Sequence, residues 1–143
     1  MHTKSTEQFA DLLRCNSVTA WRDQVFRLGN ELGYEQTLLA ILPDRNAPVE
    51  AEFAFLHSNY SDGWRNKYDQ EELQHVDPTF THCINKSIPL IWSPDIFSFR
   101  KQKEMYEEAC AYGLRSGVTL PIHGAQGEMG ILCFASDAKP GRV

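Results

Sequence analysis

The sequence contains no long apolar run and no closely spaced cysteines. None of its apolar stretches approaches the ~20 residues that a helix needs to cross a bilayer, and residues 1–7 lack the apolar segment of a signal peptide. The four cysteines are widely separated, without a Cys-x-x-Cys pair, which is typical of free, mostly buried thiols in an intracellular protein. We therefore expect a cytoplasmic protein that has no disulfide framework and does not contact a membrane.

Concentrated positive charge is also scarce. The chain has 14 Lys and Arg against 19 Asp and Glu, which gives a formal net charge of −5. The one locally basic stretch, residues 100–103, is followed by Glu104, Glu107 and Glu108, so it predicts a solvated helix face. By itself the chain is therefore a poor candidate for binding DNA or RNA.

Signatures of catalysis and of metal binding are missing as well. The sequence has no Gly-rich phosphate loop, nucleophile elbow or paired-carboxylate motif, and its five histidines show no metal-ligand spacing. His82 and Cys83 are adjacent, but neighbouring residues on a helix point about 100° apart and would not form a dyad. We therefore expect neither an enzyme nor a resident metal or cofactor.

What is present is an ordinary globular composition with clear periodicity. A chain of 143 residues, 42% hydrophobic and 23% charged, predicts one domain over 1–143. Turn-like sequence lies at 44–50 and a hairpin signal at 124–127. The pattern predicts helices near 9–13 and over 18–32, 62–68, 78–85 and 101–112, with strands over 37–42, 53–56, 89–92, 117–122 and 129–134. This order favours an α+β fold with a mainly antiparallel sheet and helices on its faces.

Tyr60, Trp64 and Tyr68 recur every four residues, which places them near one face of a helix. The commoner use of such a stripe is to fill a core. Tyr hydroxyls and Trp indole N–H groups need hydrogen-bond partners when buried, however, and a polar ligand would supply them. Arg65 lies between these aromatics and is expected at the surface or at a pocket rim.

Asp77 precedes Pro78, and Asp at an N-cap with Pro at the first helical position is a standard helix start. The other interpretation is that Asp77 turns inward and accepts a ligand N–H, which a carboxylate binds more strongly than a neutral group does. The two roles are compatible, because one carboxylate has several acceptor positions.

In this order and spacing, these residues resemble the N-terminal autoinducer-binding domain of LuxR-type quorum-sensing receptors. The resemblance runs from about residue 21 to 136 and is greatest to a pseudomonad receptor for a long-chain 3-oxo-acyl homoserine lactone. It implies an α/β/α sandwich with a central, mainly antiparallel five-stranded sheet, helices on both faces, and the ligand between the sheet and one helical layer. The matching positions are 59–60, 64–65, 68, 76–79, 89–92, 107–109, 113–114 and 117–124.

The resemblance also implies a role for each matching polar residue. Trp64 would donate to the lactone carbonyl, Tyr60 to the amide carbonyl, and Asp77 would accept the amide N–H. Thr79 would support the same head group. Cys133 stands where the pseudomonad receptor has a serine that helps to hold the amide carbonyl, and a thiol is a weaker donor than a hydroxyl.

The acyl tail would lie along an apolar wall, and parity agrees with this. Leu38 and Ala40 share one face of their strand, and Met105 and Ala109 share one face of their helix. Each buried CH₂ is worth ~0.8 kcal/mol, so chain length is expected to set much of the affinity. The expected tail contacts are Leu38, Ala40, Tyr68, Trp92, Phe97, Met105, Ala109, Leu114 and Ile131, and Arg65 and Thr119 complete the expected ligand-binding set.

Function is therefore expected to be that of a sensor domain that couples an N-acyl homoserine lactone to folding and to homodimerisation or heterodimerisation with LuxR-type receptors. DNA would be reached only through a C-terminal helix-turn-helix domain, which these 143 residues do not contain. The family's long helix after the last strand is also missing. The alternative is a truncated LuxR-type protein that binds no signal and antagonises full-length receptors by heterodimerisation. An acyl-lactone hydrolase is a third, unsupported interpretation.

Overall fold

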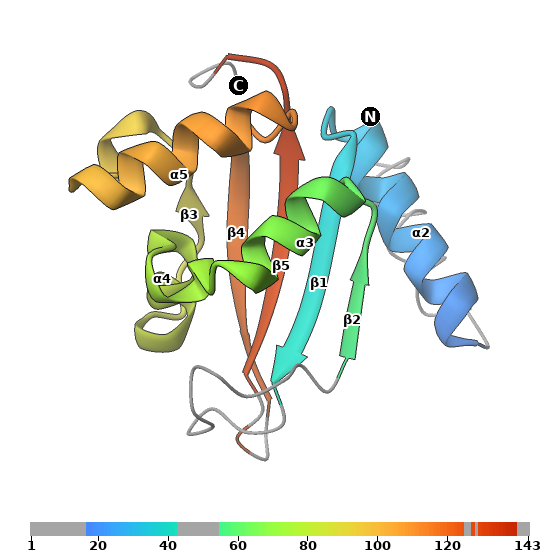
Figure 1. Cartoon of the computed structure of the whole chain (residues 1–143). Coiled ribbons are helices and arrows are strands. Elements are labelled where there is room, and N and C mark those ends of the chain that lie inside the picture. The colour runs from blue at the N-terminus through green and yellow to red at the C-terminus, as the bar shows by residue number, and fades with distance from the viewer. Residues whose placement is uncertain (1–16, 43–54, 125–126, 128, 140–143) are drawn as a thin grey trace.

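The computed structural model describes residues 17–42, 55–124, 127 and 129–139. Helices and strands alternate along the chain much as the sequence predicts (Figure 1). In chain order the elements are α2 (Val18–Glu31), β1 (Gln36–Leu42), β2 (Phe55–Ser58), α3 (Asp62–Gln70), the 3₁₀ turn η1 (Leu73–His75), α4 (Pro78–Asn85), β3 (Leu90–Ile91), the 3₁₀ turn η2 (Pro94–Ile96), α5 (Arg100–Ala111), β4 (Ser116–His123) and β5 (Met129–Ser136).

The strands form one five-stranded sheet in the order β2-β1-β5-β4-β3, and every neighbouring pair is antiparallel. β5 lies at the centre, with Cys133 opposite Leu38 of β1 on one side and opposite Thr119 of β4 on the other. β3 pairs with β4 only as far as Thr119, so the missing N–H of Pro121 interrupts no bond to that strand. The predicted antiparallel α+β sheet is confirmed.

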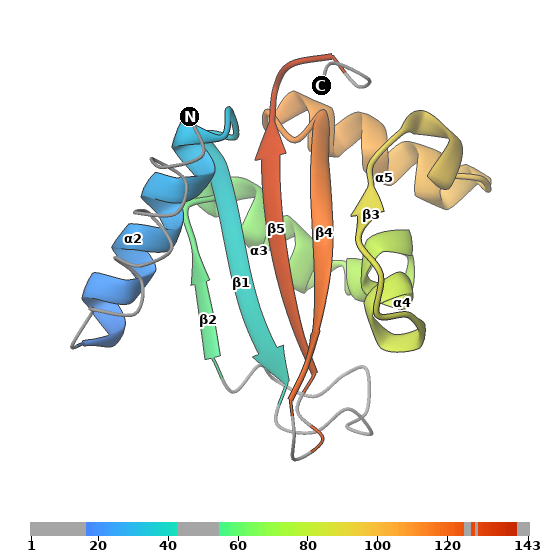
Figure 2. The same cartoon turned by 180° about the vertical axis from the view of Figure 1, so that it is seen from behind.

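Helices cover both faces of this sheet, as an α/β/α sandwich requires. α3, α4 and α5 lie on one face, while α2 lies on the other beside β1 (Figures 1 and 2). α2 approaches the sheet closely at Gly29, where an added Cβ would meet the ring of Phe134 at 2.7 Å and Oγ1 of Thr37 at 2.8 Å. A glycine is therefore needed at this contact between helix and sheet.

Capping residues fix the two helices that carry most of the polar site. The Trp64 amide N–H donates to Oγ of Ser61 (3.1 Å), which caps α3. The Thr79 amide N–H donates to Oδ1 of Asp77 (2.9 Å), with Pro78 at the first helical position of α4. The predicted N-cap role of Asp77 is confirmed, and it fixes where the carboxylate lies.

Most predicted boundaries agree with the structure to within two residues. β2, α3 and β5 each continue two residues beyond the predicted end, and residues 53–54 of the predicted second strand lie outside the described part of the chain. The predicted helix near 9–13 and the turn at 44–50 also lie outside it. β3 is shorter than the predicted strand 89–92, although the Trp92 N–H still donates to the Gly117 carbonyl (2.9 Å).

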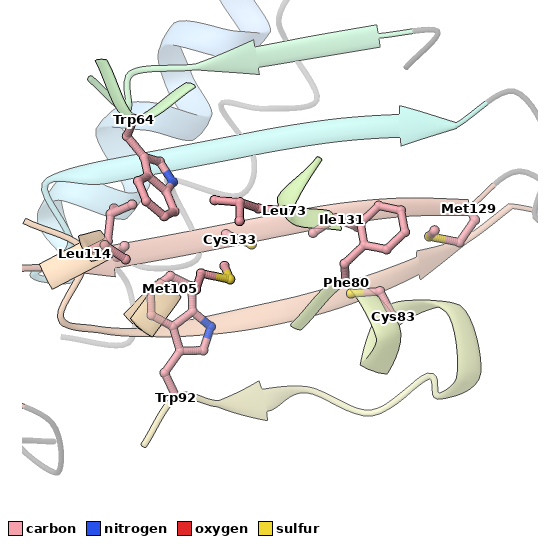
Figure 3. Packing of buried hydrophobic residues seen from close by; sticks show 12 residues of the cluster. Trp64, Leu73, Phe80, Cys83, Trp92, Met105, Leu114, Met129, Ile131 and Cys133 are labelled. Carbon is pink, nitrogen blue, oxygen red and sulfur yellow. The ribbon is translucent and has the colours of Figure 1, made fainter. Parts of the chain in front are cut away.

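The main core lies between the sheet and the layer of α3, α4 and α5 (Figure 3). Trp64, Leu114, Met105 and Trp92 lie toward one end of this cluster, and Phe80, Cys83 and Met129 toward the other. The core is therefore built largely around aromatic and sulfur-containing side chains.

Within the described ranges, no helix combines the length and apolar character that crossing a bilayer requires.

Candidate ligand-binding site

A cavity opens within this layer, between the sheet strands β1 and β5 and the helices α3, α4 and α5. The space between its lining atoms, including the open mouth, is ≈ 720 Å³. The lining residues are Leu38, Ala40, Tyr60, Trp64, Arg65, Tyr68, Asp77, Thr79, Phe80, Trp92, Phe97, Met105, Tyr106, Ala109, Leu114, Ile131 and Cys133. The tertiary fold thus gathers residues that lie up to 95 positions apart (Leu38 to Cys133) around one space.

Of the sixteen residues that the sequence predicts for the site, fifteen line this cavity and Thr119 does not. Thr119 is fully buried behind the wall, in contact with two residues that do line it. Two lining residues, Phe80 and Tyr106, were not predicted. Helical spacing contained a signal for Tyr106, which follows Met105 and precedes Ala109 by three positions, and for Phe80, which follows Asp77 by three.

Asp77 is the most heavily bonded polar group of the site. Its Oδ1 accepts the Thr79 amide N–H at 2.9 Å and the Thr79 hydroxyl at 2.8 Å, and its Oδ2 accepts the Tyr68 hydroxyl at 2.8 Å. Burial raises the pKa of the Asp77 carboxyl, against the opposing effect of the hydrogen bonds from Thr79 and Tyr68. The Phe80 backbone N–H also bonds to this carboxylate. A carboxylate has about four acceptor positions in all, so it can still accept a ligand N–H beside the Tyr68 hydroxyl.

The segment before Asp77 is held by α5. Gln102 is buried, and its Nε2 donates to the Val76 carbonyl at 3.1 Å. Its Oε1 in turn accepts the Ser98 amide N–H at 2.9 Å. The position of the carboxylate is thus tied to α5, to α3 through Tyr68, and to α4 through its own cap.

Trp64 and Tyr60 carry donors that have no hydrogen-bond partner among the described residues. The Trp64 indole N–H makes no hydrogen bond within the described residues, although its ring packs against Tyr68 (centroids 6.0 Å apart) and Tyr112 (5.7 Å). The Tyr60 hydroxyl is buried and likewise has no partner in the described part of the chain. Burial, together with the nearby Cys133 and Asp77, raises the Tyr60 pKa well above its usual value, so this hydroxyl remains a donor.

Trp92 is the opposite case, because its indole is already paired. Its Nε1–H donates to Oγ1 of Thr119 at 2.8 Å, and the same oxygen lies 3.3 Å from Sγ of Cys133. Burial raises the pKa of the Cys133 thiol to about 12, so the sulfur is protonated at neutral pH. Trp92 therefore contributes its ring to the wall and no free donor.

The rest of the wall is apolar. Its residues are those that the alternation of a strand and the spacing of a helix place on one face. Leu38 and Ala40 face the cavity from β1, and Ile131 lies opposite Ala40 on β5. Met105 and Ala109 face it from α5. These predictions of shared faces agree with the lining.

An aromatic pair and a cation complete the lining. Phe97 stacks on Tyr106 with ring centroids 4.5 Å apart, and the Tyr106 hydroxyl donates to the Arg115 carbonyl at 2.6 Å. Arg65 lies over the ring of Tyr68, with Cζ 5.8 Å from the centroid, and its Nη2 is 3.5 Å from Oδ1 of Asp69. Its side chain is 16% exposed, which agrees with the predicted rim position.

The arrangement suits binding. One region offers two donors that are unpaired among residues 17–42, 55–124, 127 and 129–139, together with a carboxylate that can accept a further hydrogen bond, and the remainder is mainly apolar. No group of three or more His, Cys, Asp or Glu side chains that could hold a metal ion occurs among the described residues. The site can therefore orient a molecule that has a small polar head and an apolar tail.

Comparison with known proteins identifies the family. Residues 17–141 match the model of the autoinducer binding domain. Sequence relatives include the transcriptional activators VanR of Vibrio anguillarum (31% identical over 113 residues, 78% of this chain and 46% of VanR) and AnoR of Acinetobacter nosocomialis (33% over 129 residues, 87% of this chain and 53% of AnoR). The chain belongs to the autoinducer-binding domain family of LuxR-type quorum-sensing regulators, as the sequence resemblance implied.

The same fold occurs in solved structures of this family. The N-acylhomoserine lactone dependent LuxR-family factor CepR2 of Burkholderia cenocepacia superposes with a TM-score of 0.80 at 17% identity, covering 96% of this chain and 79% of CepR2. Escherichia coli SdiA gives a TM-score of 0.80 at 21% identity, covering 99% of this chain and 57% of SdiA. These likenesses confirm the sandwich fold. The chain spans about half the length of VanR and AnoR.

Proposed function

We propose that this domain binds an N-acyl homoserine lactone, with the lactone and amide held by Trp64, Tyr60 and Asp77 and a long acyl chain, 3-oxo substituted, along the apolar wall. The observation that carries the proposal is the set of unsatisfied polar groups. The buried Tyr60 hydroxyl has no partner within the described residues, the Trp64 indole N–H makes no hydrogen bond there, and the Asp77 carboxylate accepts the Tyr68 hydroxyl through only one lone pair of Oδ2. A polar group that is buried without a hydrogen-bond partner lowers the free energy of unfolding, and a polar ligand would supply the partner.

The ligand's polar atoms match this set. An acyl homoserine lactone carries two carbonyl acceptors, one on the ring and one on the amide, and a single amide N–H donor. Trp64 and Tyr60 would serve the two carbonyls, and Oδ2 of Asp77 would accept the N–H. The description of CepR2 as N-acylhomoserine lactone dependent supports the same ligand class.

The apolar remainder of the cavity supports a long tail. Leu38, Ala40, Met105, Ala109 and Ile131 offer aliphatic or thioether surface from three elements. Each CH₂ buried there contributes ~0.8 kcal/mol, or about a fourfold gain in affinity. The 3-oxo substituent rests on the sequence resemblance.

Thermal unfolding tests the proposal, because a ligand that binds only the folded state raises the midpoint. N-(3-oxododecanoyl) homoserine lactone should raise it, and Asp77→Asn or Trp64→Phe should largely remove the rise. Matched controls are Asp95→Asn, at an exposed carboxylate, and Trp21→Phe, on the α2 side of the sheet; both should keep the rise. No rise with any acyl homoserine lactone would sink the proposal.

Coupling of the ligand to dimerisation, and through a further domain to DNA, belongs to the same proposal. It is supported by the names of VanR and AnoR as transcriptional activators, which are about twice as long as this chain. Sedimentation with and without the lactone tests dimerisation. A monomer in both conditions, with the thermal rise intact, would separate binding from assembly.

A second candidate is a protein that pairs with full-length receptors without binding a signal. Exposed apolar side chains on the sheet face turned away from the cavity favour it: Ile91 is 71% exposed and Ile122 is 39% exposed. Co-purification with a full-length LuxR-type receptor in the absence of lactone would support it. Ile91→Lys should then abolish pairing, whereas Phe99→Lys, at an exposed apolar residue beside α5, should not.

A further inference from the structure

Three buried polar groups from three neighbouring segments form a short chain beside the cavity. Trp92 follows β3, Thr119 lies on β4 and Cys133 lies opposite it on β5. The Trp92 indole N–H donates to Oγ1 of Thr119 at 2.8 Å, and Oγ1 lies 3.3 Å from Sγ of Cys133. The middle member is fully buried and does not line the cavity, whereas Trp92 and Cys133 do.

The chemistry of the three groups gives this chain a direction. An indole N–H can only donate, so Oγ1 of Thr119 is an acceptor from Trp92. The Thr119 hydroxyl can then donate its own proton in a hydrogen bond, and Sγ of Cys133, 3.3 Å away, can accept it. If the hydroxyl donates to the sulfur, the S–H of Cys133 is not used in this contact and is free to point elsewhere.

Backbone packing holds the first member in place. The Trp92 N–H donates to the Gly117 carbonyl at 2.9 Å, and the Trp92 ring lies against β4, where a Cβ at position 117 would come within 2.9 Å of it (Figure 3). The ring therefore cannot shift toward the strand, and the indole nitrogen stays on the Thr119 hydroxyl. The bond from the Trp92 indole to Thr119 is thus held in place by the packing of the ring on β4.

We propose that Thr119 is a positioning residue: held by the Trp92 indole, it donates its hydroxyl proton to Sγ of Cys133 and so turns the S–H of Cys133 into the cavity as a third donor, toward a carbonyl oxygen of the ligand. The Tyr60 hydroxyl, which is buried close to Cys133 and makes no hydrogen bond within the described residues, would then face the same oxygen. The ligand part rests on the proposed function, but the direction of the hydrogen bonds does not.

Infrared spectroscopy of the ligand-free protein tests the direction. The S–H stretch moves to lower frequency when a thiol donates a hydrogen bond, and a difference spectrum against Cys133→Ala isolates the band of Cys133 from those of the other cysteines. We expect this band at the frequency of a thiol that does not donate, and unchanged in Thr119→Val. A low-frequency band that rises in Thr119→Val would mean that Cys133 donates to Thr119, and would overturn the proposal.

Ligand titration tests the consequence. N-(3-oxododecanoyl) homoserine lactone should move the Cys133 band to lower frequency in the wild type and in Thr119→Ser, which keeps the hydroxyl, but not in Thr119→Val. We expect Thr119→Val to weaken lactone binding about fivefold, and by less than about twofold in a Cys133→Ala background. A loss of the same size in both backgrounds would mean that Thr119 acts only through Trp92, and would refute the proposal.

The two kinds of failure can be distinguished. If no lactone binds, the proposed function fails, while the ligand-free spectrum still decides the direction of the hydrogen bonds. If Thr119→Val does not fold, the wild-type spectrum and Thr119→Ser still decide, because a Cys133 band already shifted before ligand is added contradicts the proposal. The indole ¹H–¹⁵N resonance of Trp92 gives an independent check, since it should move in Thr119→Val and stay in Thr119→Ser.

Discussion

Replacing Asp77 by Asn separates the cap from the proposed ligand contact. Asn is as good an N-cap residue as Asp, and Thr79 presents two donors to one side of the residue, so the amide oxygen should take the place of Oδ1. The NH₂ group then replaces Oδ2, facing Tyr68 and the position proposed for the ligand N–H. Two donors would face each other there.

The expected magnitude follows from this geometry. A hydrogen bond to a charged acceptor contributes about 1.5–3 kcal/mol, and a buried donor left unpaired costs about 1–3 kcal/mol. A net loss of about 3 kcal/mol corresponds to roughly a 150-fold weaker affinity. At a lactone concentration 100 times the wild-type Kd, ligand stabilisation would fall from about 2.7 kcal/mol to about 0.3 kcal/mol.

The assay is a thermal unfolding series with increasing lactone. For a chain of this length, 1 kcal/mol moves the midpoint by about 4 °C, so the wild type should gain about 11 °C and Asp77→Asn about 1 °C. Without ligand the two midpoints should lie within about 4 °C, since the cap is kept. A variant that gains more than half of the wild-type rise would refute the assignment of Asp77 as the acceptor.

Three further predictions concern pH, packing and chain length. Burial raises the folded-state pKa of Asp77 above its ordinary value, so its contribution to stability is present below the unfolded pKa and is lost as pH rises through the folded one. Between pH 3 and pH 7, the free energy of unfolding of the ligand-free wild type should therefore fall relative to that of Asp77→Asn, as urea denaturation at each pH would measure. Parallel curves for the two proteins would contradict this. Gly117→Ala should lower the free energy of unfolding by about 1–3 kcal/mol, because the new Cβ would lie 2.4 Å from the Phe134 carbonyl oxygen and 2.9 Å from the Trp92 ring; urea denaturation measures this, and an unchanged midpoint would exclude the clash. Ala109→Leu fills part of the apolar wall and should shift the preferred acyl chain toward a length shorter by about two to three methylenes, seen by calorimetry across a lactone series; an unchanged order of affinities would show that the tail does not pass this position.

Local signals in the sequence predicted much of the fold. Asp77 and Pro78 predicted the start of α4 to the residue, and the alternation of Leu38 and Ala40 predicted which face of β1 turns inward. Helix caps and strand alternation depend only on residues a few positions apart in the sequence, so they can be predicted without a structure. Element ends were less well predicted: pairing with β1 extends β2 to Ser58, and pairing with β4 extends β5 to Ser136, each beyond its apolar run.

Hydrogen-bond assignments were harder to predict, because they depend on strand register. Thr119 was expected among the ligand contacts, whereas it lies behind the wall and is engaged by Trp92 and Cys133. This follows from the pairing of Thr119 with Cys133 and of Leu90 with Thr119, and neither register can be read from one strand alone. Tyr106 was not predicted, although its spacing to Ala109 fits the cavity side of α5; its ring lines the cavity while its hydroxyl donates to the Arg115 carbonyl.

Asp77 caps α4 and accepts the Tyr68 hydroxyl, and in the proposed function it also accepts the ligand N–H. If this function holds, the combination limits how the ligand preference of the domain can change. A mutational scan for folded protein should tolerate only residues that keep the cap, such as Asn, and a scan for ligand binding should tolerate fewer still. Selection for a new signal therefore has little freedom here and would act instead on aliphatic positions such as Ala40 and Ala109, which make no polar contact in the described structure. In a lineage of related receptors, divergence in signal length should accumulate along the tail while the head group stays the same.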